Sequence, residues 1–322
     1  MKKTSMRKDR LCVLSGGVGG AKLALGLSKV LCAEDFLIIA NTGDDFRHFG
    51  LQISPDIDTI IYTLAGLVDS DRGWGLKNET WNFLESMKYL GAEGWFNLGD
   101  KDLATHFERT RRIDEGESLS DITRTISMLF EVDNLIVPMT DSPVQTIVDT
   151  QDGPLPFQHY FVRDRSSPIV TGFRFEGIEM AKPSPGILEF LKGNRSSVLI
   201  APSNPFVSID PILKVPGLRK LLKSVPSNRV AVSPIVNGSA IKGPAAKMMT
   251  ELGIPSTSVG VANYYKEFVD GFVIDETDTG HVQEIEDLGL SVLVTKTIMN
   301  TLEDKTILAQ ECLDFIDSLS GK

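Results

Sequence analysis

Two short acidic segments hold the residues whose type and spacing best suit metal chemistry. Asp44 and Asp45 follow the apolar run Phe36–Ala40, and Asp56 and Asp58 come shortly after them in the chain. Carboxylate oxygens suit Mg²⁺, which usually binds one or two carboxylates together with substrate phosphates. We therefore expect a Mg²⁺ site formed from Asp44, Asp45, Asp56 and Asp58. Structural roles are the alternative, because Asp56 could cap a helix and Asp44 or Asp45 could form a turn.

A glycine-rich turn directly follows the first apolar run, Leu11–Leu14. Residues 15–22 read Ser-Gly-Gly-Val-Gly-Gly-Ala-Lys. Glycines let the backbone approach a phosphate and point its N–H groups at the anion where a helix begins. The expected phosphate-binding residues are Gly16, Gly17, Gly19, Gly20 and, as a point charge, Lys22. The pattern lacks the Gly-Lys pair of a P-loop, and a tight turn for helix–strand packing is the alternative.

Polar segments elsewhere could bind the organic parts of a nucleotide or a planar substrate. Ser203 and Asn204 lie between two prolines after an apolar run, so a pre-formed backbone offers their hydroxyl and amide to a nucleobase or a ribose. Trp74 lies between two glycines, where its ring could stack on a planar ligand or anchor packing. The segment 94–106 could bind a polyol or a phosphate, and we expect its His106 to be a helix residue rather than a base.

Apolar runs that alternate with helical patterns must position these segments, and this alternation predicts an α/β fold. Between the first two runs, Leu23, Leu27, Val30 and Leu31 recur on one face of a helix. Strand, turn, helix and strand form a βαβ unit, so we expect a Rossmann-like, mostly parallel sheet with helices on both faces. The expected strands are 11–14, 36–40, 135–137, 160–162, 198–201, 230–232, 272–274 and 292–294. The polar segments should then share one rim, because ligands bind at the carboxyl ends of such strands.

The rest of the chain is expected to complete one domain, residues 11–322, after a flexible N-terminus at 1–10. Residues of about 60–132 carry helical spacing and few strand signals, which predicts a helical insertion over the C-terminal rim of the strands. Residues 150–185 alternate in short runs and predict a small antiparallel excursion. A last helix is expected at about 307–319.

Composition and charge disfavour several classes of protein. The chain has 322 residues, a net charge of −10 and 42% hydrophobic residues. A general nucleic-acid binder would show a basic face, and the basic edge formed by Arg109, Arg111 and Arg112 could be simply solvated. No apolar run is long enough to predict a membrane span. The three cysteines, Cys12, Cys32 and Cys312, are widely spaced and odd in number, which favours a reducing compartment. The first apolar run is also too short for a signal peptide, so we expect a cytoplasmic protein.

Taken in order, the motifs resemble those of the 2-phospho-L-lactate transferase family of coenzyme F-420 biosynthesis, which includes phosphoenolpyruvate-type members. The matching segments are S-G-G-V-G-G-A-K-L (15–23), N-T-G-D-D (41–45), S-P-D-I-D-T (54–59), R-G-W-G (72–75), L-G-D-K-D-L-A-T-H (98–106), A-P-S-N-P (201–205) and S-P-I-V-N-G (233–238). Each motif is weak by itself, but the ordered set is specific and runs from about residue 11 to residue 278.

The resemblance implies a transferase that moves a phosphorylated three-carbon acid, 2-phospholactate or phosphoenolpyruvate, from a guanosine diphosphate-linked donor. The acceptor would be the ribityl hydroxyl of the deazaflavin Fo (7,8-didemethyl-8-hydroxy-5-deazariboflavin), and GMP would leave. The family implies Mg²⁺ as the cofactor and a homodimer as the usual assembly. Whether a lactyl, enolpyruvyl or glyceryl unit is transferred stays open.

The same resemblance implies roles for individual residues. Asp58 is expected to contact Fo or the metal beside it, and Asn97 lies where relatives contact Fo, often with a different side chain. The carboxylate that activates the hydroxyl would be Asp45 or Asp58, and Asp44 and Asp45 are metal candidates. If the planar ligand expected from the sequence is Fo, Trp74 is the residue whose ring would stack on it. The guanosine and its phosphates would be held by Gly16, Gly17, Gly19, Gly20, Ser203 and Asn204.

Two other functions fit parts of the sequence. Regulatory proteins of the same superfold, linked to gluconeogenesis and cell-wall control, bind nucleotide-type ligands and share the glycine-rich opening. The joint presence of the segments 72–75 and 98–102 favours the enzyme. A nicotinamide-dependent dehydrogenase is disfavoured, because Lys22 stands where a dinucleotide fingerprint requires its third glycine.

Overall fold

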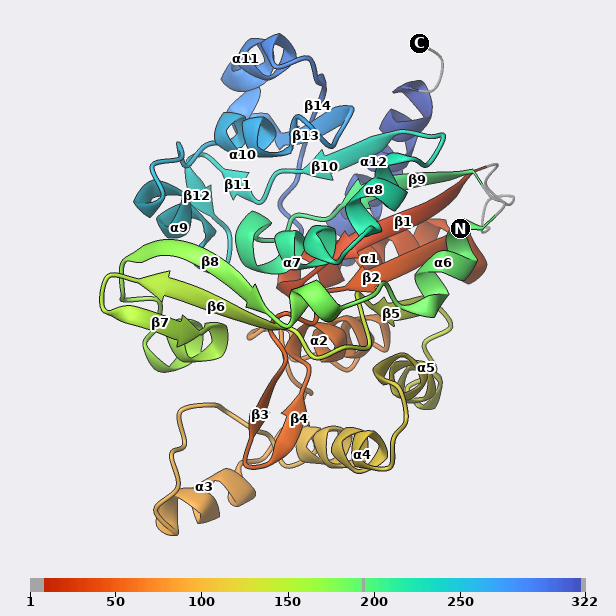
Figure 1. The fold of residues 1–322 in the computed structure, drawn as a ribbon. Helices are drawn as coiled ribbons and strands as arrows, with labels where there is room; N and C mark the ends of the chain where they lie inside the picture. Colours follow the sequence, from red (N-terminus) through yellow and green to blue (C-terminus); the bar gives the residue numbers. More distant parts are fainter. Residues whose placement is uncertain (1–8, 193–194, 320–322) are drawn as a thin grey trace.

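The computed structural model describes residues 9–192 and 195–319, and a seven-stranded parallel sheet forms its centre (Figure 1). In spatial order the strands are β14 (Ser291–Thr295), β13 (Gly271–Asp275), β10 (Arg229–Val232), β9 (Ser196–Ile200), β1 (Arg10–Ser15), β2 (Phe36–Ala40) and β5 (Leu135–Pro138). Each neighbouring pair in this sheet is parallel. The α/β fold predicted from the sequence is therefore confirmed.

Successive residues of the central strands pack into two separate cores. Cys12 and Leu14 of β1 lie on one face of the sheet, Leu11 and Val13 lie on the other, and all four are fully buried. A parallel sheet covered on both faces has unbroken apolar strands for this reason. One core also contains side chains of α1 (Gly17–Val30), α2 (Pro55–Leu64), α5 (Leu119–Leu129) and α12 (Leu302–Leu319). The other contains side chains of α6 (Pro185–Leu191), α7 (Asp210–Lys214), α8 (Leu218–Lys223), α9 (Ala245–Glu251), α10 (Ser258–Tyr265) and α11 (Val282–Asp287).

The direction of the chain across the sheet reverses beside β1. From β1 the chain passes to β2 and β5 on one side, then returns to β9 on the other side of β1 and continues outward through β10, β13 and β14. The connections that leave β1 and β9 therefore diverge and open a crevice at the carboxyl ends, where ligands bind in open α/β sheets. The glycine-rich turn follows β1, and the segment 201–205 follows β9.

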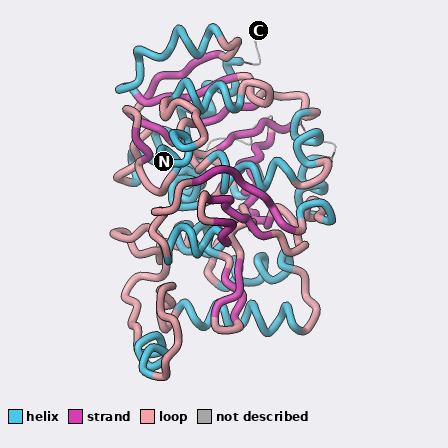
Figure 2. The backbone as a smooth tube through the Cα atoms, turned by 60° about the vertical axis from the view of Figure 1, so that its left-hand side comes forward, coloured by secondary structure: helices cyan, strands magenta, loops and turns pink. Residues whose placement is uncertain are grey.

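Smaller elements extend beyond the central sheet. The hairpin of β3 (Phe46–His48) and β4 (Leu51–Ile53) forms an arm with α3 (Asn82–Tyr89) and α4 (Asp102–Asp114), seen at the bottom of Figure 1 and again in Figure 2. A three-stranded antiparallel sheet of β6 (Gln145–Thr150), β7 (Gly153–Pro156) and β8 (Val170–Glu176) matches the predicted antiparallel excursion. A short ribbon is formed by β11 (Ile235–Val236) and β12 (Ser239–Ala240). The region predicted to be helical contains α3, α4 and α5, while α2 begins earlier, at Pro55.

The strand predicted at 160–162 is wrong, because residues His159–Arg163 form a π-helix. The rings of Phe157 and Phe161 stack with centroids 5.4 Å apart, a contact between residues four apart that a helical turn allows and an extended strand does not. The last helix begins at Leu302 rather than near residue 307. Of the N-terminus predicted to be flexible, residues 1–8 lie outside the described residues, whereas Arg10 is the first residue of β1.

Candidate active site

A cavity of about 450 Å³ opens at the reversal point beside β1. Its walls come from the glycine-rich turn, the start of α2, the insertion arm, the segment after β9 and the loop before α9. A cavity of this size accommodates a ligand as large as a nucleotide. The residues predicted from the sequence that line it are Gly16, Gly17, Gly19, Asp44, Asp56, Asp58, Trp74, Asn97, Ser203 and Asn204. Three other predicted residues, Gly20, Lys22 and Asp45, are not among the residues that line it.

The glycine-rich turn and the segment after β9 are joined by direct hydrogen bonds. The Ser203 hydroxyl donates to the Gly16 carbonyl at 2.7 Å and accepts from the Gly16 amide at 3.3 Å. A Cβ on Gly19 would lie 2.2 Å from the Pro202 carbonyl oxygen, so only glycine fits this approach. Gly17 has φ +64°, a conformation that favours glycine, and a Cβ there would meet nothing within 4 Å. The turn therefore packs tightly at Gly19 and stays open at Gly17.

Asn204 has a structural task in addition to lining the cavity. Its side-chain oxygen accepts from the Phe206 amide at 3.0 Å, which caps the π-helix Pro205–Ile209. Gly20 also has a packing role, because a Cβ there would lie 2.2 Å from the Ser15 hydroxyl. The packing-turn interpretation of the glycine motif is thus correct for part of it, and Gly16, Gly17 and Gly19 are the glycines that reach the cavity.

Asp56 is the carboxylate that holds the glycine-rich turn in place. It accepts from the Gly17 amide at 2.7 Å and from the Asn41 side chain at 2.9 Å. Asp56 is the second residue of α2, and among the described residues its carboxylate accepts from Gly17 and Asn41 rather than from the amides of its own helix. Burial raises the pKa of Asp56 to about 6.

Asp44 lies beside Asp56, but its carboxylate accepts fewer hydrogen bonds. Its Oδ1 atom is buried and has no hydrogen-bond partner among the described residues. Burial raises the pKa of Asp44 well above its usual value, and the charge of Asp56 raises it further. Two neighbouring carboxylates with an unpaired buried oxygen form a donor set that fits a cation such as Mg²⁺.

Asp45 points to the other side of this acidic segment. One of its oxygens accepts from the Ser54 hydroxyl at 2.6 Å, and the other is buried without a partner in the described part of the chain. It lines a second, smaller cavity of about 130 Å³, which also contains Asp44, Gln158 and Thr146. Burial raises the pKa of Asp45 well above its usual value. The two adjacent aspartates therefore differ in position, since Asp44 lines both cavities and Asp45 lines only the smaller one.

Asp58 is part of a buried charge network under the main cavity. Both of its oxygens accept from the Arg109 guanidinium, and the bond to Oδ2 is 3.0 Å long. Arg109 is only 1% exposed, so this ion pair is almost completely removed from water. Burial raises the pKa of Asp58, and Arg109 and His106 oppose that rise. Unlike Asp44, Asp58 is a carboxylate whose charge already has a partner.

His106 connects Asp58 to a second buried carboxylate. Its Nδ1 lies 3.6 Å from Asp58, and its Nε2 lies 3.4 Å from Asp102. Asp102 also accepts from the Tyr62 hydroxyl at 2.6 Å. Asp58, Asp102 and His106 could together hold a metal ion. The guanidinium of Arg109, already bound to Asp58, makes this a poorer cation site than the pair of Asp44 and Asp56.

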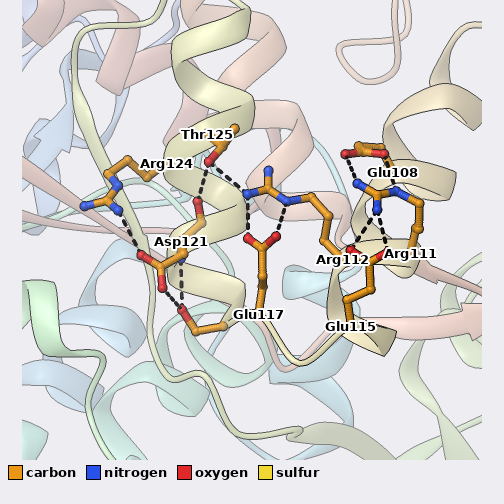
Figure 3. Close-up of polar contacts among 9 residues, drawn as sticks. Glu108, Arg111, Arg112, Glu115, Glu117, Asp121, Arg124 and Thr125 are labelled. Carbon is orange, nitrogen blue, oxygen red and sulfur yellow. Dashed lines mark hydrogen bonds and ion pairs between the residues drawn. The ribbon is translucent and has the colours of Figure 1, made fainter.

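The buried position of Arg109 was not predicted from the sequence. The three arginines expected on one basic edge separate, since Arg109 is buried, Arg111 is exposed at the surface and Arg112 is only partly exposed there. Figure 3 shows the surface pair in a network of ion pairs: Arg111 binds Glu108 and Glu115, and Arg112 binds Glu117. Helical spacing could have found the inward set, because Asp102, His106 and Arg109 recur at i, i+4 and i+7 on one face of α4.

Aromatic side chains form another part of the cavity wall. Trp74, Phe96, Phe157 and Phe161 line it together with Asn97. The wall was only partly predicted: Phe96 lies in the polar segment 94–106 that was expected to bind a ligand, whereas Phe157 and Phe161 lie in segments that were expected to form strands.

Two of the three tryptophans in the helical insertion, Trp74 and Trp81, lie close to the side chain of Arg72. The Arg72 guanidinium lies between the two rings, 5.2 Å from that of Trp74 and 5.1 Å from that of Trp81. Of these two tryptophans, Trp74 lines the cavity and Trp81 does not.

The lysine at the cavity differs from the one that was predicted. The Lys22 ammonium donates to the Met299 carbonyl at 2.9 Å, and burial lowers the pKa of Lys22. The cavity is lined instead by Lys242, which follows the β11–β12 ribbon.

These features define a Rossmann-like α/β protein with a glycine-lined cavity at its topological reversal point, as in nucleotide-binding enzymes. The chain belongs to the 2-phospho-L-lactate transferase CofD family, whose profile matches residues 11–298. It is 40% identical over 300 residues to a 2-phospho-L-lactate transferase of Methanosarcina mazei, which covers 93% of this chain and 98% of that protein. It is 36% identical over 316 residues to a phosphoenolpyruvate transferase of Streptomyces griseus, which covers 96% of this chain and 99% of that protein. The predicted family is confirmed, and the chain is a transferase.

A solved structure supports the fold independently. A UPF0052 family protein from Bacillus halodurans aligns with a TM-score of 0.62 over 96% of this chain and 100% of that chain. The two sequences are 14% identical, so the similarity concerns the fold alone.

Proposed function

We propose that this protein transfers a phosphorylated three-carbon acid from a guanosine diphosphate-linked donor to the ribityl hydroxyl of Fo and releases GMP, as a step of coenzyme F-420 biosynthesis. Membership of the family supports the reaction type. The observation that carries the proposal is the convergence of the glycine-rich turn, the acidic segments, Trp74 and Ser203 on one cavity. Phosphoryl-type transfers need positioning and charge neutralisation more than covalent catalysis, and this cavity offers both.

The donor would bind at the reversal point between β1 and β9. Backbone amides of the glycine-rich turn would bind the phosphates, and the open side of Gly17 leaves room for close approach. Ser203 and Asn204 would lie along the guanosine. Asp44 and Asp56 would hold Mg²⁺, which supplies neutralising charge to the phosphates when it is bound. Asp45 is a further candidate for metal binding from the side of the smaller cavity.

The acceptor would lie against the aromatic wall. The planar ring system of Fo would stack on Trp74, Phe96 or Phe161, and Asn97 would contact its edge. Asp58 would accept the proton of the ribityl hydroxyl as that oxygen forms its bond to phosphorus and the bond to the GMP oxygen breaks. We prefer Asp58 to Asp45 as this base, because Asp58 lines the cavity and Asp45 does not.

A matched pair of aspartate variants tests this assignment. Asp58→Asn should reduce product formation by about 100-fold or more, the range of a lost general base, while Fo still binds. Asp133→Asn, at an exposed carboxylate away from the cavity, is the control and should keep wild-type turnover. Wild-type turnover of Asp58→Asn would remove Asp58 from the mechanism.

The donor could carry a lactyl, an enolpyruvyl or a glyceryl unit. Relatives with both names resemble this chain at similar identity, 40% and 36%, so the comparison does not separate a lactyl from an enolpyruvyl donor. Donors that differ by one or two atoms are distinguished by the shape of the pocket. Turnover with the lactyl, enolpyruvyl and glyceryl donors side by side should reveal one preferred substrate, and equal rates would mean that the enzyme does not select.

We further propose a homodimer in the cytoplasm that binds no nucleic acid. Large apolar side chains exposed on the outer helices support an interface there, with Tyr89 91% and Leu129 75% exposed. The three cysteines form no disulfide, which suits a reducing compartment. None of the described helices combines the length and apolar character needed to cross a bilayer. Light scattering after gel filtration should give about twice the chain mass of 35.3 kDa, and a monomer would contradict the assembly.

A further inference from the structure

The charge balance of the cavity is unfavourable for a diphosphate unless a cation joins it. The carboxylates that line the cavity are Asp44, Asp56, Asp58 and Asp102. Lys242 is the single lysine or arginine among the described residues that line it. Asp58 is already paired with Arg109, so Lys242 is the cationic side chain left to meet a ligand in this part of the structure.

The Lys242 ammonium lies next to the glycine-rich turn. A Cβ built on Gly73 would be 2.9 Å from the Lys242 Nζ and also 2.9 Å from a methyl group of Val18. Val18 is the residue between Gly17 and Gly19, and it also lines the cavity. The Lys242 ammonium therefore lies near the glycine-rich turn at Val18.

The present hydrogen-bond partner of the Lys242 ammonium is a neutral carbonyl group, which a phosphate oxygen could replace. Its ammonium donates to the backbone carbonyl of Arg72 at 2.9 Å, and the described residues provide no carboxylate within ion-pair distance of it. A hydrogen bond from an ammonium to a phosphate oxygen is stronger than one to a neutral carbonyl.

The loop that carries Lys242 is built from turn residues. Asn237 and Gly238 have φ +48° and +72°, as a two-residue hairpin turn between β11 and β12 requires, and Gly243 follows Lys242 with φ +76°. The Arg72 carbonyl comes from a loop of the same character, next to Gly73 with φ +80°. Lys242 therefore joins, by one side-chain hydrogen bond, two loops that both contribute residues to the cavity lining.

We propose that Lys242 leaves the Arg72 carbonyl and binds the diphosphate of the donor, opposite the amides of the glycine-rich turn. This inference rests on the proposed function insofar as that function supplies a guanosine diphosphate-linked donor. It assigns to Lys242 the role that the sequence suggested for Lys22, whose ammonium is committed to Met299 outside the cavity.

Calorimetric titration with GDP tests the assignment, because GDP carries the diphosphate without the acid. Lys242→Met should weaken GDP binding by about tenfold or more, which corresponds to roughly 1.4 kcal/mol. Lys242→Arg keeps the charge and should recover most of the affinity. Lys77→Met is the matched control, because the Lys77 ammonium also donates to a carbonyl at 2.9 Å, that of Gly66, but lies outside the cavity.

Fo titrated by its fluorescence separates this inference from the proposed function. The three variants should bind Fo as the wild type does, since Lys242 is assigned to the donor. Wild-type affinity of Lys242→Met for GDP, or an equal loss in Lys77→Met, would overturn the role of Lys242 and leave the proposed function intact. A wild-type protein that binds neither GDP nor Fo would overturn both.

Discussion

Two buried aspartates of the site, Asp58 and Asp44, differ in how their negative charge is compensated. Asp58 is paired with Arg109, so its charge is balanced within the protein. Asp44 has an unpaired oxygen and a carboxylate neighbour, so its charge is balanced only when a proton or a cation is bound. We therefore expect that neutralising Asp44 stabilises the fold, whereas removing the partner of Asp58 destabilises it.

Replacing Asp44 by asparagine should stabilise the metal-free protein above neutral pH. Burial and Asp56 raise the pKa of Asp44 above the unfolded value of 3.8, so the folded state binds the proton more tightly than the unfolded chain does. Stability of the wild type should therefore fall as pH rises from about 4 through the pKa of Asp56 at about 6 and beyond.

Thermal unfolding across this pH range measures the effect. At pH 8 without metal, Asp44→Asn should melt about 2–4 °C or more above the wild type, and the fall in stability with pH should be shallower. Mg²⁺ should stabilise the wild type more than the variant. Equal Mg²⁺ responses of the two proteins would contradict a metal role for Asp44.

Removing Arg109 should be costly, because it leaves Asp58 buried and unpaired. Arg109→Met is expected to lower the free energy of unfolding by about 3–5 kcal/mol. The double variant Asp58→Asn with Arg109→Met should lose less than the single one, since the uncompensated charge is gone. Urea unfolding with Arg111→Met as the exposed control, expected to cost about 1 kcal/mol or less, makes the comparison. Additive losses in the double variant would mean that the ion pair carries no such coupling.

Among the secondary-structure elements, the close approach of the loops that follow β1 and β9 determines which residues the glycine-rich turn can contain. The turn after β1 and the segment after β9 are far apart in the sequence but are joined through Gly16 and Ser203. The strand, turn and helix order could be predicted from the sequence because apolar runs and glycines are local signals. Which glycine packs and which stays open could not, because that depends on Pro202, a residue of another loop.

Gly19→Ala tests this close approach. Its Cβ would lie 2.2 Å from the backbone oxygen of Pro202, which cannot move away as a flexible side chain could. We expect a loss of about 1–3 kcal/mol in the free energy of unfolding, together with weaker GDP binding. Gly280→Ala is the control, since a Cβ there meets nothing within 4 Å and should change stability by about 0.5 kcal/mol or less. A Gly19→Ala protein as stable as the control would show that the loops can separate without cost.

At the scale of the whole molecule, the cavity is assembled from segments that the chain brings together across the sheet. Sequence motifs identified the glycine turn, the acidic segments, Trp74 and Ser203, because each stands beside a strand end or a turn residue. The pairing of Asp58 with Arg109 and the position of Lys242 at the cavity could not be predicted, because they depend on how α4 and the β11–β12 ribbon pack. The π-helix at 159–163 was missed because its alternating aromatics imitate a strand.

Mass analysis of the product formed from Fo would decide whether the protein catalyses the proposed transfer. Fo would be incubated with the wild-type protein and each of the three guanosine donors, with Mg²⁺ and with a chelator. A phosphodiester of Fo with one three-carbon acid, formed together with GMP only when Mg²⁺ is present, is the predicted result. Unchanged Fo with every donor, from a protein that still binds GDP, would contradict the proposed transfer and the acceptor roles of Trp74 and Asp58.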